Sequence, residues 1–296
     1  MTSTDLHFVD AHHHLWDLGH CNYPWLMAKG EMRFFGDPGP IQKNYFIDDF
    51  LAESVDYRPV KSVHIQVGVT PTDEVRETAW LQSQQPYPHA IVAATDLRAD
   101  KLQTALKTHG QSDRLRGFRQ ILGRHELEDK KHGSDALLKD PNFLRGLSLL
   151  AAQGLSFDLQ MVPPQMNQVV ALFKQVPTLP VVLCHAGSPW DQSQAGLRSW
   201  REGLEKFAAL PNTYCKLSGL GMFNPHWDEA ALRPIILQVL DTFGPTRVMF
   251  GSNFPVDKLY NDYGYLWQSY DRVTADFSTI ERQQMFCTTA ENFYRI

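Results

Sequence analysis

Three consecutive histidines, His12, His13 and His14, stand near the N-terminus directly after an apolar run. If this segment is a β-strand, side chains alternate between its faces, so His12 and His14 share one face and His13 takes the other. Two imidazoles at positions i and i+2 of a strand end can converge on one metal ion or on one substrate atom. The pair therefore indicates a pocket at the end of this strand.

A further histidine, His185, lies at the end of the apolar run 180–186. Three histidines from two strand ends, His12, His14 and His185, match a catalytic zinc site with an open fourth position. The same three rings can instead bind an anionic substrate or move protons without a metal. The sequence thus leaves two alternatives open: one divalent ion, with zinc first, or no metal.

Two cationic side chains fall inside runs that should be buried strands. Arg119 lies in the run 115–122 and Lys216 in the run 212–220. A buried arginine is costly unless it faces a wet, anionic site, and its planar fork suits a carboxylate. We therefore expect Arg119 and Lys216 to hold carboxylate or hydroxyl groups of a substrate.

The last β-rich run, 247–255, carries Asn253 at its tip, and Asp257 follows just beyond. An asparagine forms hydrogen bonds but is no base at neutral pH, whereas an aspartate can be one. We expect Asp257 or a histidine to take the proton from an attacking water, and Asn253 to orient that water.

Composition narrows the classes of function. The 296 residues contain 28 Lys and Arg against 33 Asp and Glu, without basic clusters, so nothing indicates nucleic-acid binding. No apolar run reaches membrane-spanning length, and the N-terminus lacks a signal-peptide pattern. The four cysteines have no C-x-x-C spacing, which predicts the reducing cytoplasm and neither disulfides nor thiolate zinc. Cys184 and Cys215 are expected to face away from the pore.

The candidate residues need a scaffold that brings strand ends together. Eight β-rich, mostly continuous apolar runs alternate with helical patterns, as in parallel strands buried on both faces. The runs are 7–14, 60–69, 90–97, 115–122, 155–162, 180–186, 212–220 and 247–255. Eight such right-handed units fit a closed (β/α)₈ TIM barrel of the α/β class, with its active site at the C-terminal strand ends. A doubly wound sheet usually has a glycine-rich phosphate loop where the histidines stand here.

No linker, repeat or low-complexity tract divides the chain, so we expect a single domain over residues 1–296. Helices are expected to begin near 46 and 72 and to span 100–107, 142–152, 164–176, 194–210, 229–243, 265–274 and 279–294. The connection 15–44 is much longer than usual, and it contains Trp25 and four other aromatic residues. Loops of that length often form lids or binding loops.

Several motifs together resemble the amidohydrolase superfamily, and within it the amidohydrolase-related group of sugar-acid lactonases and pyrone-dicarboxylate lactonase. The resemblance extends over nearly the whole chain. Its motifs are Asp10–Trp16, Leu115–Arg119, Phe157–Gln160, His185 with Gly187 and Pro189, Cys215–Gly219 and Phe250–Val256.

The resemblance implies a (β/α)₈ barrel in which water attacks a carbonyl group. The family's H-x-H pair corresponds to His12 and His14, and its sixth-strand histidine to His185. Its catalytic eighth-strand aspartate corresponds to Asn253, so the base here must be another group or the activity is altered. Arg119 and Gln160 stand near the places of the lysine and histidine that complete a binuclear centre elsewhere, which favours one metal or none.

We therefore predict a hydrolase that opens a small sugar-acid or aromatic-catabolic lactone. Trp25 and Gln160 are expected to join Arg119 and Lys216 in binding this small-molecule substrate. The prediction includes no nucleic-acid or membrane partner, and it allows a homo-oligomer. The alternatives are a metal-dependent decarboxylase of the same superfamily and a catalytically altered barrel that only binds a ligand.

Overall fold

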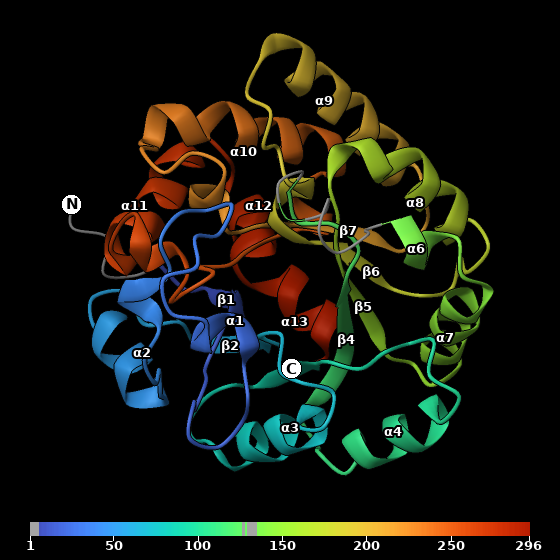
Figure 1. Cartoon of the computed structure of the whole chain (residues 1–296). Helices are drawn as coiled ribbons and strands as arrows, with labels where there is room; N and C mark the ends of the chain where they lie inside the picture. The colour runs from blue at the N-terminus through green and yellow to red at the C-terminus, as the bar shows by residue number, and fades with distance from the viewer. Residues whose placement is uncertain (1–5, 126–127, 129–134) are drawn as a thin grey trace.

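Eight parallel strands form the centre of the protein. In the computed structural model, which describes residues 6–125, 128 and 135–296, each strand pairs with the next in chain order (Figure 1). The strands are β1 (Val9–His13), β2 (Lys61–Ile65), β3 (Ala90–Ala93), β4 (Leu115–Ile121), β5 (Ser156–Gln160), β6 (Val181–Leu183), β7 (Thr213–Leu217) and β8 (Val248–Phe250). Each lies within a predicted β-rich run, and the predicted (β/α)₈ barrel is confirmed.

Helices pack around the strands, most of them on the outside of the barrel (Figure 1). They are α1 (Pro24–Met27), α2 (Ile47–Glu53), α3 (Glu74–Ser83), α4 (Leu102–His109), α6 (Asp135–Leu138), α7 (Pro141–Ala152), α8 (Met166–Phe173), α9 (Gln194–Ala208), α10 (Glu229–Phe243), α11 (Tyr263–Val273), α12 (Thr279–Gln283) and α13 (Thr289–Tyr294). The single helix expected over 279–294 is interrupted by a π-helical segment, Gln284–Thr288, which separates α12 from α13.

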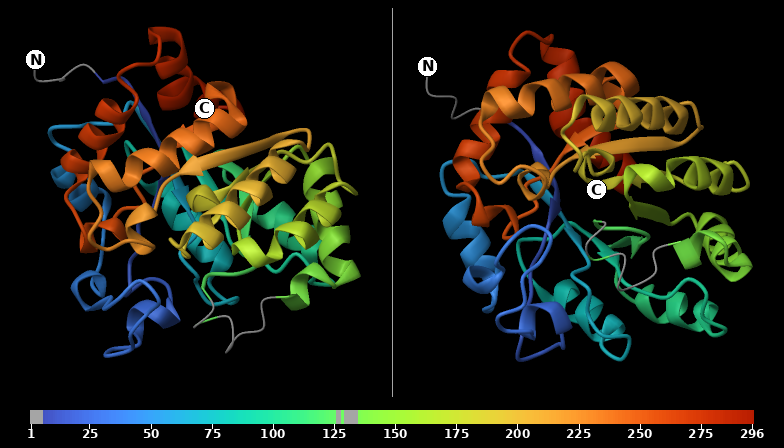
Figure 2. Two further views of the ribbon diagram at one scale, coloured as in Figure 1. Left: turned by 90° about the horizontal axis from the view of Figure 1, so that it is seen from above. Right: turned by 45° about the horizontal axis from the view of Figure 1, so that its top comes forward.

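The barrel interior has an apolar lower part. Buried side chains from several strands fill it, and α13 closes it with Phe293 and Tyr294. The strand residues are Val9, Ala11, Val63, Ile65, Ala90, Val92, Val182 and Met249. Because Phe293 packs on Tyr214 near the start of β7, α13 covers the N-terminal end of the barrel. Helix α1 and its long loop lie at the opposite end (Figure 2, left).

Backbone hydrogen bonds close the barrel between its first and last strands. The amide of Asn253 donates to the carbonyl of His12 at 2.7 Å, and the amide of His14 donates to the carbonyl of Phe254 at 2.8 Å. Gly251 permits this approach, because a Cβ atom on it would lie 2.6 Å from the Cβ atom of His12. The closure thus brings His12 of β1 and His14, which directly follows β1, against the residues after β8.

Candidate active site

The three predicted histidines lie together at the C-terminal mouth of the barrel. The ring centroids of His12 and His14 are 5.1 Å apart, and those of His12 and His185 are 4.6 Å apart. An irregularity in the β1–β2 pairing between Asp10 and His13 breaks the strand's alternation. His13 takes another environment, as expected, and stacks on Phe50 at 4.4 Å.

The backbone turns sharply at His185. Strand β6 ends at Leu183, and His185 has φ 54°, in the left-handed region that non-glycine residues rarely adopt. Such strained backbone clusters at functional sites. Strict alternation after Val182 would place Cys184 inside and His185 outside, but the bend turns the His185 ring into the mouth as well.

The expectation that Cys184 faces away from the pore is therefore wrong. Its Sγ atom lies 3.9 Å from Oδ2 of Asp158 in the barrel interior. The error arises because the alternation was counted through a residue that leaves the strand conformation. Cys215 packs instead in the large apolar cluster between strands and helices.

Hydrogen bonds fix two of the three histidine rings. Nδ1 of His14 lies 2.8 Å from the carbonyl of Ile65, so that nitrogen carries the hydrogen. Nδ1 of His185 lies 3.0 Å from Oγ and 3.2 Å from the carbonyl oxygen of Ser218, which leaves Nε2 for a ligand. Both ring nitrogens of His12 are buried without a hydrogen-bond partner.

Burial and nearby cations keep these histidines neutral at physiological pH. Burial is the main cause that lowers the pKa of His14 to about 3, and the charge of Arg119 adds to it. Burial likewise lowers the pKa of His12 and His185, with Lys216 the largest charge effect on His12 and Arg119 on His185. A neutral imidazole is the form that binds a metal or accepts a proton.

Asn253 and Asp257 meet at the tip of β8. Asn253 has φ 57°, and its Oδ1 lies 3.2 Å from Nε2 of His14, while its Nδ2 is buried without a partner. Asp257 is 3% exposed, and neither carboxyl oxygen has a partner at ordinary hydrogen-bond distance and angle, although polar groups lie near both. Burial raises the pKa of Asp257 to about 8, although the Asn253 side chain and the backbone amides of Gly219 and Gly221 oppose the rise.

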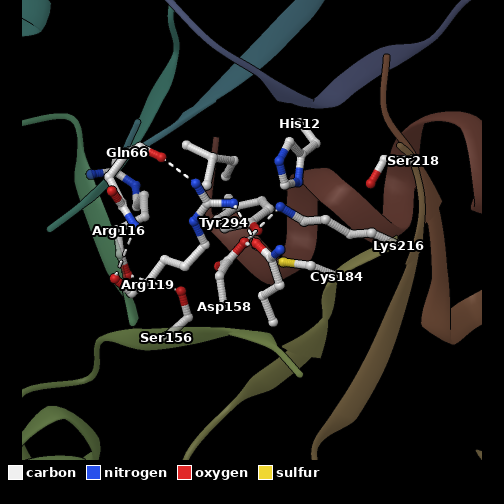
Figure 3. A network of polar contacts seen from close by, with 12 residues as sticks. His12, Gln66, Arg116, Arg119, Ser156, Asp158, Cys184, Lys216, Ser218 and Tyr294 are labelled. Atoms are coloured by element: carbon white, nitrogen blue, oxygen red, sulfur yellow. Dashed lines mark hydrogen bonds and ion pairs between the residues drawn. The ribbon is translucent and has the colours of Figure 1, made fainter. Parts of the chain in front are cut away.

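Arg119 lies deeper, on β4, at the rim of a buried polar network (Figure 3). Its Nη1 donates to Oε1 of Gln160 at 3.2 Å, and its Nη2 donates to the carbonyl of Gln66. Its Nε is buried without a partner. The structure thus brings the two predicted residues Arg119 and Gln160 into contact.

Lys216 is fully buried on β7, and its Nζ lies 2.6 Å from Oδ2 of Asp158. The hydroxyl of Tyr294 donates to the same carboxylate, at 3.0 and 2.9 Å from its two oxygens (Figure 3). Asp158 lies in the sequence motif Phe157–Gln160, but the sequence did not predict this role for it. Tyr294 was not predicted either, because no local pattern indicates that a C-terminal helix contacts the barrel interior.

Trp25 lies further out, in the long loop after β1. Its half-buried indole donates from Nε1 to the carbonyl of Val67 at 2.7 Å. Trp16 lies between it and the histidines, with ring centroids 6.1 Å from Trp25 and 6.5 Å from His14. Trp25 therefore borders the approach to the mouth rather than the histidine cluster itself.

The donors at the mouth fit a metal ion in part. His12 offers two unpartnered nitrogens and His185 offers Nε2, whereas Nε2 of His14 faces the Asn253 amide. Over the described residues, no three His, Cys, Asp or Glu side chains are placed so that they could hold a metal ion together. His12 and His185 are thus the residues best placed to bind one, and the full three-histidine set stays a prediction.

Comparisons with known proteins place the chain in a family. The model of the amidohydrolase family matches residues 9–296. The uncharacterised protein y4mH of Sinorhizobium fredii is 37% identical over 297 residues, which cover 99% of this chain and all of that protein. L-fucono-1,5-lactonase of Burkholderia multivorans is 29% identical, over 97% of this chain and 96% of the enzyme.

A solved structure gives the same result. An amidohydrolase of Burkholderia multivorans with bound zinc superposes with a TM-score of 0.84 at 27% identity, over 98% of this chain and 99% of that one. In the part of this chain that the structure describes, no helix is both long and apolar enough to cross a membrane. The family match over nearly the full length confirms the resemblance drawn from the motifs. The chain belongs to the amidohydrolase family.

Proposed function

We propose that the protein is a lactonase, a hydrolase that opens a small sugar-acid lactone by water attack on the ring carbonyl. The observation that carries the proposal is the meeting of His12, His185, Asn253 and Asp257 at one barrel mouth. Full-length similarity to an L-fucono-1,5-lactonase supports this substrate class. In the reaction, water adds to the carbonyl, the ring C–O bond breaks, and the ring oxygen leaves with a proton as the hydroxyl of a hydroxy acid.

Asp257 is the base in this proposal. Its carboxyl group is buried and lies beside Asn253, whose side-chain amide can hold the water. An aspartate in its ionised form accepts the proton as water attacks. The neutral ring of His12, whose nitrogens have no protein partner, can donate an N–H hydrogen bond to the carbonyl oxygen and polarise the carbonyl group.

A divalent ion held by His12 and His185 would supply Lewis-acid polarisation of the carbonyl. Arg119 binds hydroxyl or carboxylate groups of the substrate in this proposal, because its guanidinium group is buried and its Nε has no partner in the protein. Lys216 remains a predicted substrate ligand, but its close ion pair with Asp158 favours a role in keeping His12 neutral.

The test is turnover of L-fucono-1,5-lactone, other aldonolactones and pyrone carboxylates, followed by acid release with and without a chelator. We expect ring opening of at least one aldonolactone. Folded protein that opens none of these rings contradicts the proposal. Release of carbon dioxide from aromatic carboxylates would point to a decarboxylase instead, and tight lactone binding without turnover to a binding barrel.

A further inference from the structure

A tight turn in the long loop after β1 reaches over the mouth of the barrel. The amide of Arg33 donates to the carbonyl of Gly36 at 2.9 Å, and the amide of Gly36 donates back to Arg33 at 3.0 Å. Gly36 has φ +110°, a conformation that a residue with a Cβ atom rarely adopts. These bonds fix Phe34 and Phe35 as the tip of the turn, which we call the mouth turn (Arg33–Gly36).

Phe35 anchors the mouth turn beside the candidate base. Its ring is 7% exposed and lies edge-on to Trp25, with centroids 6.1 Å apart. Its carbonyl accepts a hydrogen bond from the hydroxyl of Tyr260 at 2.7 Å. A Cβ atom on Gly221 would lie 2.5 Å from the Tyr260 ring and 2.6 Å from Oδ1 of Asp257, so Tyr260 connects the mouth turn to the Asp257 region.

Phe34 extends the other way, across the mouth. Its ring stacks on His125 of the loop after β4 at 5.4 Å and 4°, and on Phe223 of the loop after β7 at 6.2 Å and 22°. His125 in turn meets Trp190 of the loop after β6 at 5.3 Å. All four rings keep part of their surface exposed. The four rings form a row that connects the loops after β1, β4, β6 and β7.

We propose that the mouth turn is a specificity element, in which the Phe34 ring limits the size of the substituent that a lactone carries away from its carbonyl. The carbonyl must reach the histidines at the strand ends, so the remainder of the substrate extends outward under this row of rings. Because the closed mouth turn holds Phe34 in place, its ring and the rings stacked on it leave little room for a larger substituent. This inference rests on the proposed lactonase function.

The experiment compares two lactones, L-fucono-1,5-lactone and the bulkier δ-lactone of lactobionic acid. Phe34→Ala is expected to raise the ratio of kcat/KM for the bulky over the small lactone by about tenfold, the usual effect of a changed pocket wall. Phe34→Trp is expected to lower that ratio. Met32→Ala is the matched control, because Met32 is 69% exposed in the same loop and should leave the ratio unchanged.

A second measurement does not depend on turnover. Trp25 and Trp190 are half-buried beside the row, and Trp80 is half-buried away from it, beside His20. The other four tryptophans, Trp16, Trp200, Trp227 and Trp267, are buried. Phe34→Ala should therefore increase quenching of tryptophan fluorescence by acrylamide, and Met32→Ala should not. If the wild-type protein opens none of the lactones in the panel given above, the proposed function fails, and the quenching result decides whether Phe34 covers the mouth. An unchanged ratio, a parallel fall for both lactones or unchanged quenching would overturn the inference.

Discussion

Asp257 is buried beside Asn253, and the proposed reaction needs its ionised form. Because burial raises its pKa to about 8, the carboxyl group is mostly protonated at pH 7 and becomes a base as the pH rises through 8. We therefore expect kcat/KM, which reports the free enzyme, to increase with pH and to level off only about one pH unit above that pKa, as a pH profile of initial rates measures. A profile that is flat between pH 6 and 9 would assign the base to another group.

Substitution of the same residue gives a second measure. Asp257→Asn should lower kcat by about 10²–10⁴-fold, the usual effect of removing general-base catalysis. KM should change little, because the lost interaction forms in the transition state. Asp56→Asn, at an exposed position, is the control and should keep wild-type kinetics. If both variants behave alike, Asp257 is not the base.

The side chain at position 253 affects how strongly the site binds a cation. Nε2 of the neutral His14 ring carries a lone pair. The NH₂ group of Asn253 can donate to it once the side-chain amide rotates to exchange its oxygen and nitrogen. A carboxylate there would need a proton or a cation between the two groups. Asn253→Asp should therefore strengthen zinc binding by about ten- to hundredfold, as changes close to a metal site do.

Titration calorimetry with zinc alone measures this effect. His12→Asn combined with Asn253→Asp should abolish the gain, since His12 carries the unpartnered nitrogens. Equal zinc affinity of Asn253→Asp and the wild-type protein would show that residue 253 does not face the ion.

The elements that hold these residues were predictable where the backbone is regular. Continuous apolar runs located all eight strands, because parallel strands are buried on both faces. The runs were too long at their C-terminal ends, since β6 stops at Leu183 and β8 at Phe250. Beyond these points the chain enters left-handed conformations at His185 and Asn253, which depend on tertiary contacts that no local pattern encodes.

The same reason limits what sequence could reveal of the site. The meeting of the three histidines could be predicted from residue type and position at strand ends, because the ends of parallel strands meet at one edge, whereas spacing alone could not decide whether Asp257 reaches them. The contact of Ser218 with His185 and the entry of Tyr294 into the barrel are long-range contacts between ordinary residues. The mouth turn also escaped prediction, although the length of its loop was noted.

The join between β1 and β8 depends on one glycine. Gly251→Ala would place a methyl group 2.6 Å from the Cβ atom of His12 and 2.7 Å from its backbone nitrogen. We expect a loss of about 1–3 kcal/mol in the free energy of unfolding, typical of overpacking, measured by urea denaturation. Gly264→Ala is the control, because its nearest neighbour would be 3.4 Å away and alanine favours a helix such as α11. Equal stability of the two variants would contradict the crowding described at Gly251.

At the scale of the whole molecule, α13 connects the last residues of the chain to the barrel interior. Tyr294→Phe removes the hydroxyl that donates to Asp158 and leaves the shape of the ring. A buried charged acceptor that loses one donor should cost about 1–3 kcal/mol of stability. Urea denaturation measures the change, with Tyr265→Phe as a control. A negligible difference for Tyr294→Phe would mean that Lys216 alone suffices for this carboxylate.

The hydrogen bonds that close the barrel run between His12 and Asn253 and between His14 and Phe254, which are residues of the candidate site or their direct neighbours. The joining of β1 to the end of β8 and the assembly of the candidate site therefore depend on the same hydrogen bonds. We therefore expect no catalytic activity from a half-barrel, from a protein with a frayed first strand or from a partly folded intermediate. Activity of a molecule therefore shows that its first strand and the segment after its last strand are joined.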